Sequence, residues 1–159
     1  MLQSIRTLFG FATSGLRVGQ EVARLLRQRR GDARALLEEL KANQDLCAMV
    51  LEEGSDPMKV IPALQTAQYD RLLASGYDFD SLRGAPIAAY GALERSDLAS
   101  FIGKGSGHLV EDIYDKIKEL ERRFRLDRDN ARIDWRRRII NLYKRMLLLV
   151  HHLRAGQAK

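Results

Sequence analysis

The sequence predicts an all-α protein: an antiparallel four-helix bundle with an irregular short-helix insertion between the third and fourth long helices. Proline is scarce, with three residues in 159, and β-branched residues are few beside leucine, alanine, arginine and glutamate, a composition that favours helices. Apolar residues recur every three or four positions over long stretches, which is the spacing of a helix face. A chain of this length fits one domain, and we expect it to span residues 1–156 and to leave 157–159 as a disordered C-terminal tail.

The first helix is expected over residues 2–30, where apolar and small residues fall on one face and arginines on another. Gly15 and Gly19 lie one turn apart on the apolar side. Such a pair either lets a second helix approach closely or leaves the helix bent or partly frayed. We take both glycines as candidate interface residues. The amphipathic pattern also makes this helix a candidate for contact with an anionic membrane surface.

The second helix is expected over residues 32–53, with Asp32 as its N-cap. Its apolar positions alternate at spacings of four and three, and Asn43 falls among them. A polar residue in such a seam either sets helix register or oligomeric state through a buried hydrogen bond, or lies partly exposed at the edge of the seam. Cys47 in the same seam is interpreted as a small core residue.

A third helical stretch is expected over residues 57–75, capped by Asp56 and with a kink or a late start at Pro62. Residues 77–107 contain five glycines and little apolar periodicity, which predicts a long connection with one or two short helices. Its last part, residues 103–107, could cradle an anion on successive backbone amides. Because it lacks the spacing of a phosphate-binding loop, we interpret it as a flexible linker.

Two further helices are expected over residues 108–126 and 129–156, the second capped by Asp129 or Asn130. Their apolar seams match and the link between them is short, which predicts an antiparallel helical hairpin. The last helix also has apolar residues outside its seam, and Leu148 points almost opposite to the seam. Either this helix is central in the bundle, or part of it is buried between subunits. We expect self-association as a homo-oligomer, with Leu148 in the interface.

Basic residues concentrate in this hairpin. Between positions 122 and 145, ten arginines and lysines oppose three aspartates, so this stretch alone accounts for the net charge of +6. Arginine suits phosphate because its guanidinium fork matches two oxygens at once. The alternative is a solvated helix face, or arginines paired with acids of the second helix such as Glu38, Glu39, Glu52 and Glu53. The candidate anion-binding residues are Arg122, Arg123, Arg125, Arg128, Arg132, Arg136, Arg137 and Arg138.

The end of the last helix offers the only candidate catalytic residues, Arg145, His151 and His152. An arginine and a histidine that are separated by four to six residues, on a late helix of a small bundle, resemble the RNA-cleaving motif of the HEPN nucleases. The resemblance covers this helix alone, and Met146 stands where a polar residue usually follows the arginine. It implies a metal-independent ribonuclease in which the arginine stabilises the phosphate and the histidine transfers protons, usually across a dimer.

Other classes of function lack the residues that they need. The single cysteine rules out an internal disulfide and a cysteine-based zinc site, and the histidines have no metal-binding spacing to carboxylates, so we expect no metal and no cofactor. No apolar stretch is long enough to cross a membrane, and we expect a cytoplasmic protein. We therefore expect a non-enzymatic interaction module that binds RNA or DNA through its arginines. The alternatives are a ribonuclease and a membrane-surface or protein-scaffold module.

Overall fold

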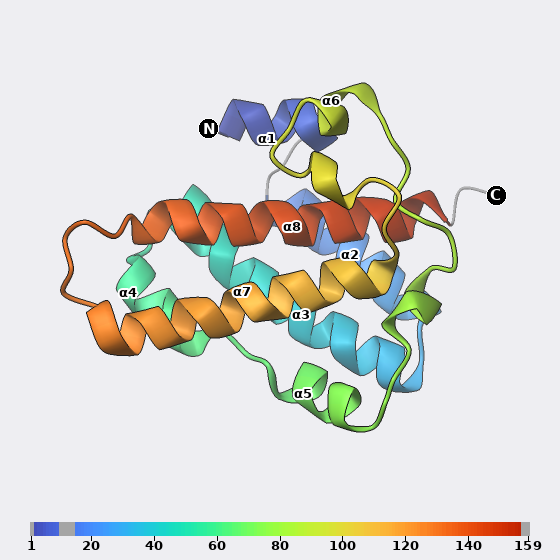
Figure 1. The fold of residues 1–159 in the computed structure, drawn as a ribbon, viewed down its shortest axis with the longest axis horizontal. Coiled ribbons are helices and arrows are strands. Elements are labelled where there is room, and N and C mark those ends of the chain that lie inside the picture. Colours follow the sequence, from blue (N-terminus) through green and yellow to red (C-terminus); the bar gives the residue numbers. More distant parts are fainter. Residues whose placement is uncertain (1, 10–14, 157–159) are drawn as a thin grey trace.

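The computed structural model describes residues 2–9 and 15–156, and within these ranges the chain is all-helical, as predicted, without a strand. None of the helices in this part of the chain combines the length and the apolar character needed to span a membrane. Short 3-10 helices connect several of the α-helices: η1 (Ile61–Ala63), η2 (Phe79–Leu82) and η3 (Ala99–Phe101). The α-helices are α1 (Leu2–Phe9), α2 (Gly15–Gln28), α3 (Gly31–Glu52), α4 (Pro57–Val60), α5 (Ala67–Ala74), α6 (Gly91–Glu94), α7 (Ser106–Asp127) and α8 (Trp135–Ala155) (Figure 1).

Helix α8 is the centre of the fold. It packs against α1, α2, α3, α4 and α7, and it crosses the middle of the molecule in Figure 1. Its predicted seam is buried from Trp135 to Leu153. The apolar residues outside the seam are buried as well, and Leu148 is 0% exposed. The prediction of Leu148 as a subunit-interface residue is therefore wrong, because helices of the same chain cover the whole apolar arc.

The single helix predicted over residues 2–30 is instead two helices with different neighbours. Helix α1 packs against α6 and α8, whereas α2 packs against α3 and α8. The residues between them, 10–14, lie outside the described part of the chain, as does the predicted tail at 157–159. The apolar faces of both helices are used inside the protein, since Ile5 of α1 and Val22 of α2 are each 1% exposed.

The close helix approach considered for the two glycines of α2 is absent at Gly19. Among the described residues, no atom outside the adjacent residues and the helix's own backbone lies within 4 Å of the position that a Cβ would take at this partly exposed residue. The surroundings of Gly15 lie outside what the structure describes. A role of either glycine at an interface between copies stays a prediction.

The helix predicted over residues 57–75 is broken into α4, η1 and α5, with extended backbone at Leu64 shortly after Pro62. Its predicted cap is confirmed, because the side chain of Asp56 accepts a hydrogen bond from the N–H of Met58 (2.9 Å). The irregular region therefore begins directly after α3 and continues to α7. The insertion predicted between the third and fourth long helices is thus longer and lies earlier in the chain than expected.

Two buried polar side chains of α3 hold this break in place. Asn43 is fully buried and exchanges two hydrogen bonds with the backbone of Gln65, each 2.7 Å long. The carboxylate of Glu39 accepts hydrogen bonds from the N–H groups of Gln68 (2.6 Å) and Tyr69 (3.1 Å) in the first turn of α5. The partly exposed position considered for Asn43 is therefore wrong, and its hydrogen bonds fix the register of a loop within the chain.

The glycine-rich loop before α7, residues 103–107, is held by hydrogen bonds at both of its ends. The N–H of Gly103 donates to the carbonyl oxygen of Ile87 (2.9 Å), and the N–H of Ile87 donates to the carbonyl oxygen of Lys104 (2.9 Å). The N–H of Gly107, in the first turn of α7, donates to the carboxylate of Asp80 (2.8 Å). The interpretation as a flexible linker is therefore wrong, and the amide at the start of α7 is already bonded to an anion of the same chain.

The caps predicted for the second and last helices are also wrong. Asp32 lies inside the first turn of α3 and does not precede the helix. Helix α8 begins at Trp135, after Asp134, whose side chain accepts a hydrogen bond from the N–H of Arg137 (2.9 Å). The link between α7 and α8 is therefore longer than predicted, but the two helices still pack against each other as a hairpin.

Candidate anion-binding site

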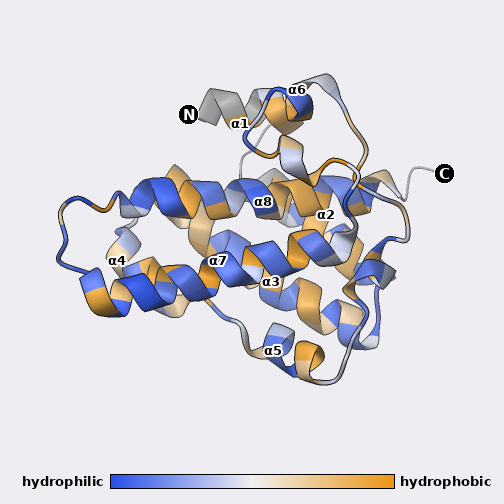
Figure 2. Ribbon diagram, viewed as in Figure 1, coloured by the Kyte–Doolittle hydropathy of each residue, from blue (hydrophilic) through white to orange (hydrophobic). Residues whose placement is uncertain are grey.

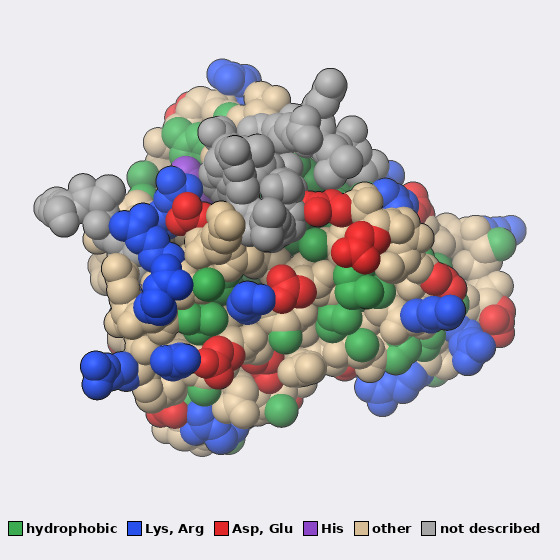
Figure 3. All heavy atoms as spheres, turned by 180° about the vertical axis from the view of Figure 1, so that it is seen from behind, with side chains coloured by type: hydrophobic (Ala, Val, Ile, Leu, Met, Phe, Trp, Pro, Cys, Tyr) green, Lys and Arg blue, Asp and Glu red, His purple; other side chains and the backbone are tan. Residues whose placement is uncertain are grey.

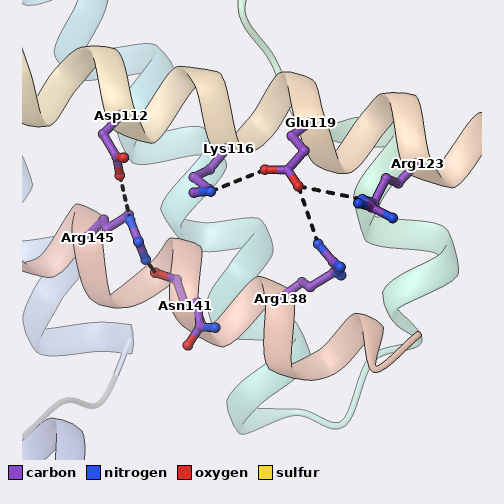
Figure 4. Close-up of polar contacts among 7 residues, drawn as sticks. All are labelled: Asp112, Lys116, Glu119, Arg123, Arg138, Asn141 and Arg145. Atoms are coloured by element: carbon purple, nitrogen blue, oxygen red, sulfur yellow. Dashed lines mark hydrogen bonds and ion pairs between the residues drawn. The ribbon is translucent and has the colours of Figure 1, made fainter. Parts of the chain in front are cut away.

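Polar residues of α7 and α8 face each other along one side of the helical hairpin (Figure 4). Long hydrophilic stretches run along both helices in Figure 2. On each helix the residues are three or four positions apart, and this spacing places them on one face. We call this feature the hairpin groove; its residues are Asp112, Lys116, Glu119 and Arg123 of α7 and Arg138, Asn141 and Arg145 of α8.

The carboxylate of Glu119 is shared by three basic side chains. Its oxygens lie 3.2 Å from Lys116 Nζ, 3.5 Å from Arg123 Nε and 3.7 Å from Arg138 Nη1. The hydrogen bond from Lys116 is the main cause that lowers the pKa of Glu119 below its ordinary value, and attraction from the two arginines adds to it. The groove therefore stabilises a negative charge at this position.

Arg145 lies further along the groove and is fixed at two points. Its Nε lies 2.6 Å from Asp112 Oδ2, and its Nη1 donates to the carbonyl oxygen of Asn141 at 2.9 Å. Only 17% of the side chain is exposed. Because the guanidinium is held in advance, it loses little conformational freedom on contact with a further anion.

A cavity of about 150 Å³ lies between the two helices within the groove. Besides the groove residues it is lined by Leu120 and Leu142, both buried, so it combines charged walls with apolar ones. A second hollow of about 400 Å³ adjoins it, since Arg138 and Asn141 line both. The other residues that line the second hollow are Arg132, Ile133, Asp134 and Arg137.

The eight arginines predicted to bind an anion lie in several different settings. Arg123 and Arg138 belong to the hairpin groove, whereas Arg132 and Arg137 line the adjoining hollow. Arg136 instead donates hydrogen bonds to carbonyl oxygens at the C-terminal end of α3, which stabilises that helix end. The predicted set therefore contains residues that could bind an anion and one with a structural role.

The other arginines of the set are exposed on the hairpin. Arg125 lies 4.0 Å from a carboxylate oxygen of Glu121, and Arg128 Nε lies 3.7 Å from Asp129 Oδ1. Arg122 has no ion-pair partner among the described residues. The pairing with the glutamates of α3 that was considered as an alternative is not found, since the described ion pairs of these arginines are with acids of α7 and of the link to α8.

The opposite face of the molecule differs from the hairpin. In Figure 3 basic and acidic side chains are interspersed over most of this face, with apolar side chains between them and a group of basic ones near the left edge. A hollow near α1 and α6 is lined by Arg95 and Lys144 beside Asp97, but the two adjoining hollows of the hairpin each have a larger excess of basic over acidic side chains. The hairpin groove is therefore the candidate site.

The predicted catalytic residues are not brought together. Arg145 is bonded to Asp112 of α7, whereas His152, seven residues and roughly 10 Å further along α8, is 3% exposed. Nη1 of Arg83 lies 3.1 Å from His152 Nδ1 and also donates to the carbonyl oxygen of His152. Burial, followed by the nearby charge of Arg83, lowers the pKa of His152 to about 4. The ring of His151 packs beside an aromatic ring of the loop region.

Sequence reasoning missed Lys116 and Glu119, although a signal for them was present. Together with Asp112 and Arg123 they repeat at spacings of four and three beside the apolar seam of α7, which marks a polar stripe on the helix. Arg83 was missed because it lies in the irregular region, where no periodicity indicates which side chains approach α8.

Cys47 is a core residue, as predicted. It is fully buried, and burial raises the pKa of its thiol to about 12, so it is not poised to act as a nucleophile. Within the ranges that the structure describes, no group of three or more histidine, cysteine, aspartate or glutamate side chains has an arrangement that could hold a metal ion.

No protein-family model, curated protein or solved structure matches this chain.

Proposed function

We propose that this protein is a non-enzymatic helical module that binds nucleic acid through the phosphate backbone along the hairpin groove. The observation that carries the proposal is the convergence of basic side chains from two helices on one groove with a cavity. Arginine and lysine are the side chains that proteins use most to bind phosphate. In this proposal α2, α3, α7 and α8 form an antiparallel four-helix bundle that keeps the groove rigid, in a cytoplasmic protein.

The adjoining hollow extends the positively charged surface beyond the groove. Arg132 and Arg137 line it, and neither has an ion-pair partner among the described residues. They can bind phosphate without losing an internal ion pair, unlike Arg138, which already contacts Glu119. A strand that crosses both hollows would therefore meet arginines along its whole path.

The aromatic residues of α8 are not available to stack on bases. Trp135 is 9% exposed and Tyr143 is 1% exposed. Proteins that bind single strands gain base contacts from exposed aromatic side chains, and phosphate contacts alone carry no sequence information. We therefore expect binding that depends steeply on salt and little on sequence.

Binding of a labelled RNA and a labelled duplex DNA, measured by fluorescence anisotropy at about 50 and 200 mM salt, tests the proposal. The double variant Arg132→Ala/Arg137→Ala removes two exposed charges from the adjoining hollow. It should bind more weakly and lower the salt slope by about two, one for each lost phosphate contact.

The matched control is Arg24→Ala/Arg27→Ala, which removes the same charge from exposed positions on α2. It should keep the affinity and the salt slope of the wild type. Absence of binding by the wild type at the lower salt concentration contradicts the proposal. Equal losses in the two double variants would mean that net charge, and not the groove, governs binding.

The alternatives have less support. The ribonuclease would need an arginine and a histidine that face one substrate, and Arg145 and His152 lie in separate environments. Membrane-surface binding would need the apolar face of the first two helices, which is buried within the protein at Ile5 and Val22. Self-association as a homo-oligomer stays a prediction; burial of Leu148 removes this residue from the interface, and Gly15 and Gly19 remain its candidates.

A further inference from the structure

The three basic side chains around Glu119 lie further from its carboxylate than in a close ion pair. Its three cationic partners lie 3.2, 3.5 and 3.7 Å away, whereas charge-assisted hydrogen bonds from nitrogen to a carboxylate are about 2.7–2.9 Å long. The three cations come from two helices, and none of them approaches the carboxylate of Glu119 to that distance. A tetrahedral anion in the cavity beside Glu119 has three free oxygens for the three basic side chains that line it, Lys116, Arg138 and Arg145.

The cavity beside Glu119 limits the size of such an anion. Its volume of about 150 Å³ is below the roughly 300–1,000 Å³ of pockets that enclose drug-sized ligands. It therefore fits a single compact group and leaves the remainder of a ligand outside. The adjoining hollow with Arg132 and Arg137 is the natural place for that remainder, since the two spaces share Arg138 and Asn141.

The charge of the groove favours a doubly charged anion. Its four basic side chains oppose two carboxylates, which leaves an excess of two positive charges. A phosphomonoester carries about −1.5 to −2 at pH 7 and presents three free oxygens. A phosphodiester within a strand carries one negative charge and so offsets the excess only in part.

We infer that the cavity binds the terminal phosphate of a phosphorylated strand or nucleotide, a phosphomonoester, in preference to an internal phosphodiester. The inference rests on the proposed function, because the adjoining hollow then holds the next phosphates of the strand. Glu119 acts in this arrangement as a built-in competitor for the same cations. Removal of its charge by Glu119→Gln should therefore strengthen binding, a gain that a damaged fold cannot imitate.

The test compares two RNA strands of the same sequence, one with a 5′-phosphate and one with a 5′-hydroxyl, each labelled at the 3′ end. We expect the wild type to bind the phosphorylated strand about tenfold more tightly, which corresponds to about 1.4 kcal/mol, because only this strand brings an additional charged group to the cavity. Arg138→Gln should remove this preference, and Glu119→Gln should enlarge it. The control Arg24→Gln, at an exposed position of α2 outside the hairpin, should leave it unchanged.

Competition with inorganic phosphate and with a nucleoside monophosphate separates a strand end from a free ligand. Equal binding of both strands with a steep salt dependence would overturn the inference and leave the proposed function standing. Binding of the nucleoside monophosphate without binding of either strand would overturn the proposed function and keep the phosphomonoester site. If Glu119→Gln weakened binding of the phosphorylated strand, Glu119 would be part of the site's framework and the inference would be wrong.

Discussion

The neutral state of buried His152 leads to a prediction about stability and pH. Arg83 donates to Nδ1 of His152, so this nitrogen must be unprotonated and the ring proton lies on Nε2. Protonation would place a second positive charge against Arg83 in a site that is nearly closed to water. Burial, then Arg83 and then His151 lower the pKa of His152 from 6.5 to about 4.

The size of the effect follows from this pKa. In the unfolded chain His152 takes up a proton as the pH falls through 6.5, whereas in the folded protein it does so only near pH 4. Between these values the unfolded state binds more protons, so stability falls as the pH falls, by about 1.4 kcal/mol per pH unit and roughly 3 kcal/mol in all. Above pH 6.5 both states are neutral and His152 adds no pH dependence.

Urea unfolding followed by circular dichroism from pH 7.5 to pH 4.5 measures this effect in the wild type and in His152→Gln. Glutamine can accept the hydrogen bond from Arg83 through its amide oxygen but cannot titrate. We expect a flatter pH dependence in His152→Gln than in the wild type. The exposed control His108→Gln should follow the wild type. Parallel curves for the wild type and His152→Gln would refute the neutral, buried histidine and reopen an acid–base role for it.

Three further changes test the contacts that shape the irregular region, each by urea unfolding. Asn43→Ala removes both hydrogen bonds to the backbone of Gln65 and should cost about 2–3 kcal/mol; a loss below 0.5 kcal/mol would show that the loop is held by other contacts. Glu39→Ala leaves two amides of the α5 N-terminus without their acceptor and should cost about 1–3 kcal/mol, and an unchanged midpoint would contradict this. Asp80→Ala removes the acceptor of the Gly107 N–H and should lower the free energy of unfolding by about 1 kcal/mol, whereas a more stable variant would contradict a stabilising role of this hydrogen bond.

The longest helices could be predicted from sequence because their apolar seams are long and regular. The seams of α3, α7 and α8 are buried as their spacing indicated, and the seam of α8 is buried from Trp135 to Leu153. A period of three and four residues over twenty residues leaves no other secondary structure that would bury the same side chains. The three helices are therefore determined by their own local sequence pattern.

The break after α4 could not be predicted in the same way. Its position depends on Asn43 and Glu39, which bond to residues more than twenty positions later in the chain. The prediction that Leu148 lies in a subunit interface was wrong for a related reason. Helical spacing shows that an apolar arc is wide, but whether the same chain or a second copy covers it depends on tertiary packing.

The candidate site was predictable in part. Arg138 and Arg145 were candidates from the sequence, the first for anion binding and the second for catalysis, but their partners on α7 depend on how the two helices face each other. The excess of arginine located the charge correctly along the chain. It could not distinguish Arg136, which stabilises the end of α3, from Arg132 and Arg137, which have no ion-pair partner among the described residues.

A nuclear magnetic resonance titration of the ¹⁵N-labelled protein with a short 5′-phosphorylated RNA tests the central claim most directly. We predict that the shifts that change on binding belong to the hairpin groove and to Arg132 and Arg137, that they diminish as salt is added, and that α2 and α5 are unaffected. Changes that centre on another part of the protein, or no changes at low salt, would contradict the assignment of the hairpin groove as a phosphate-binding site.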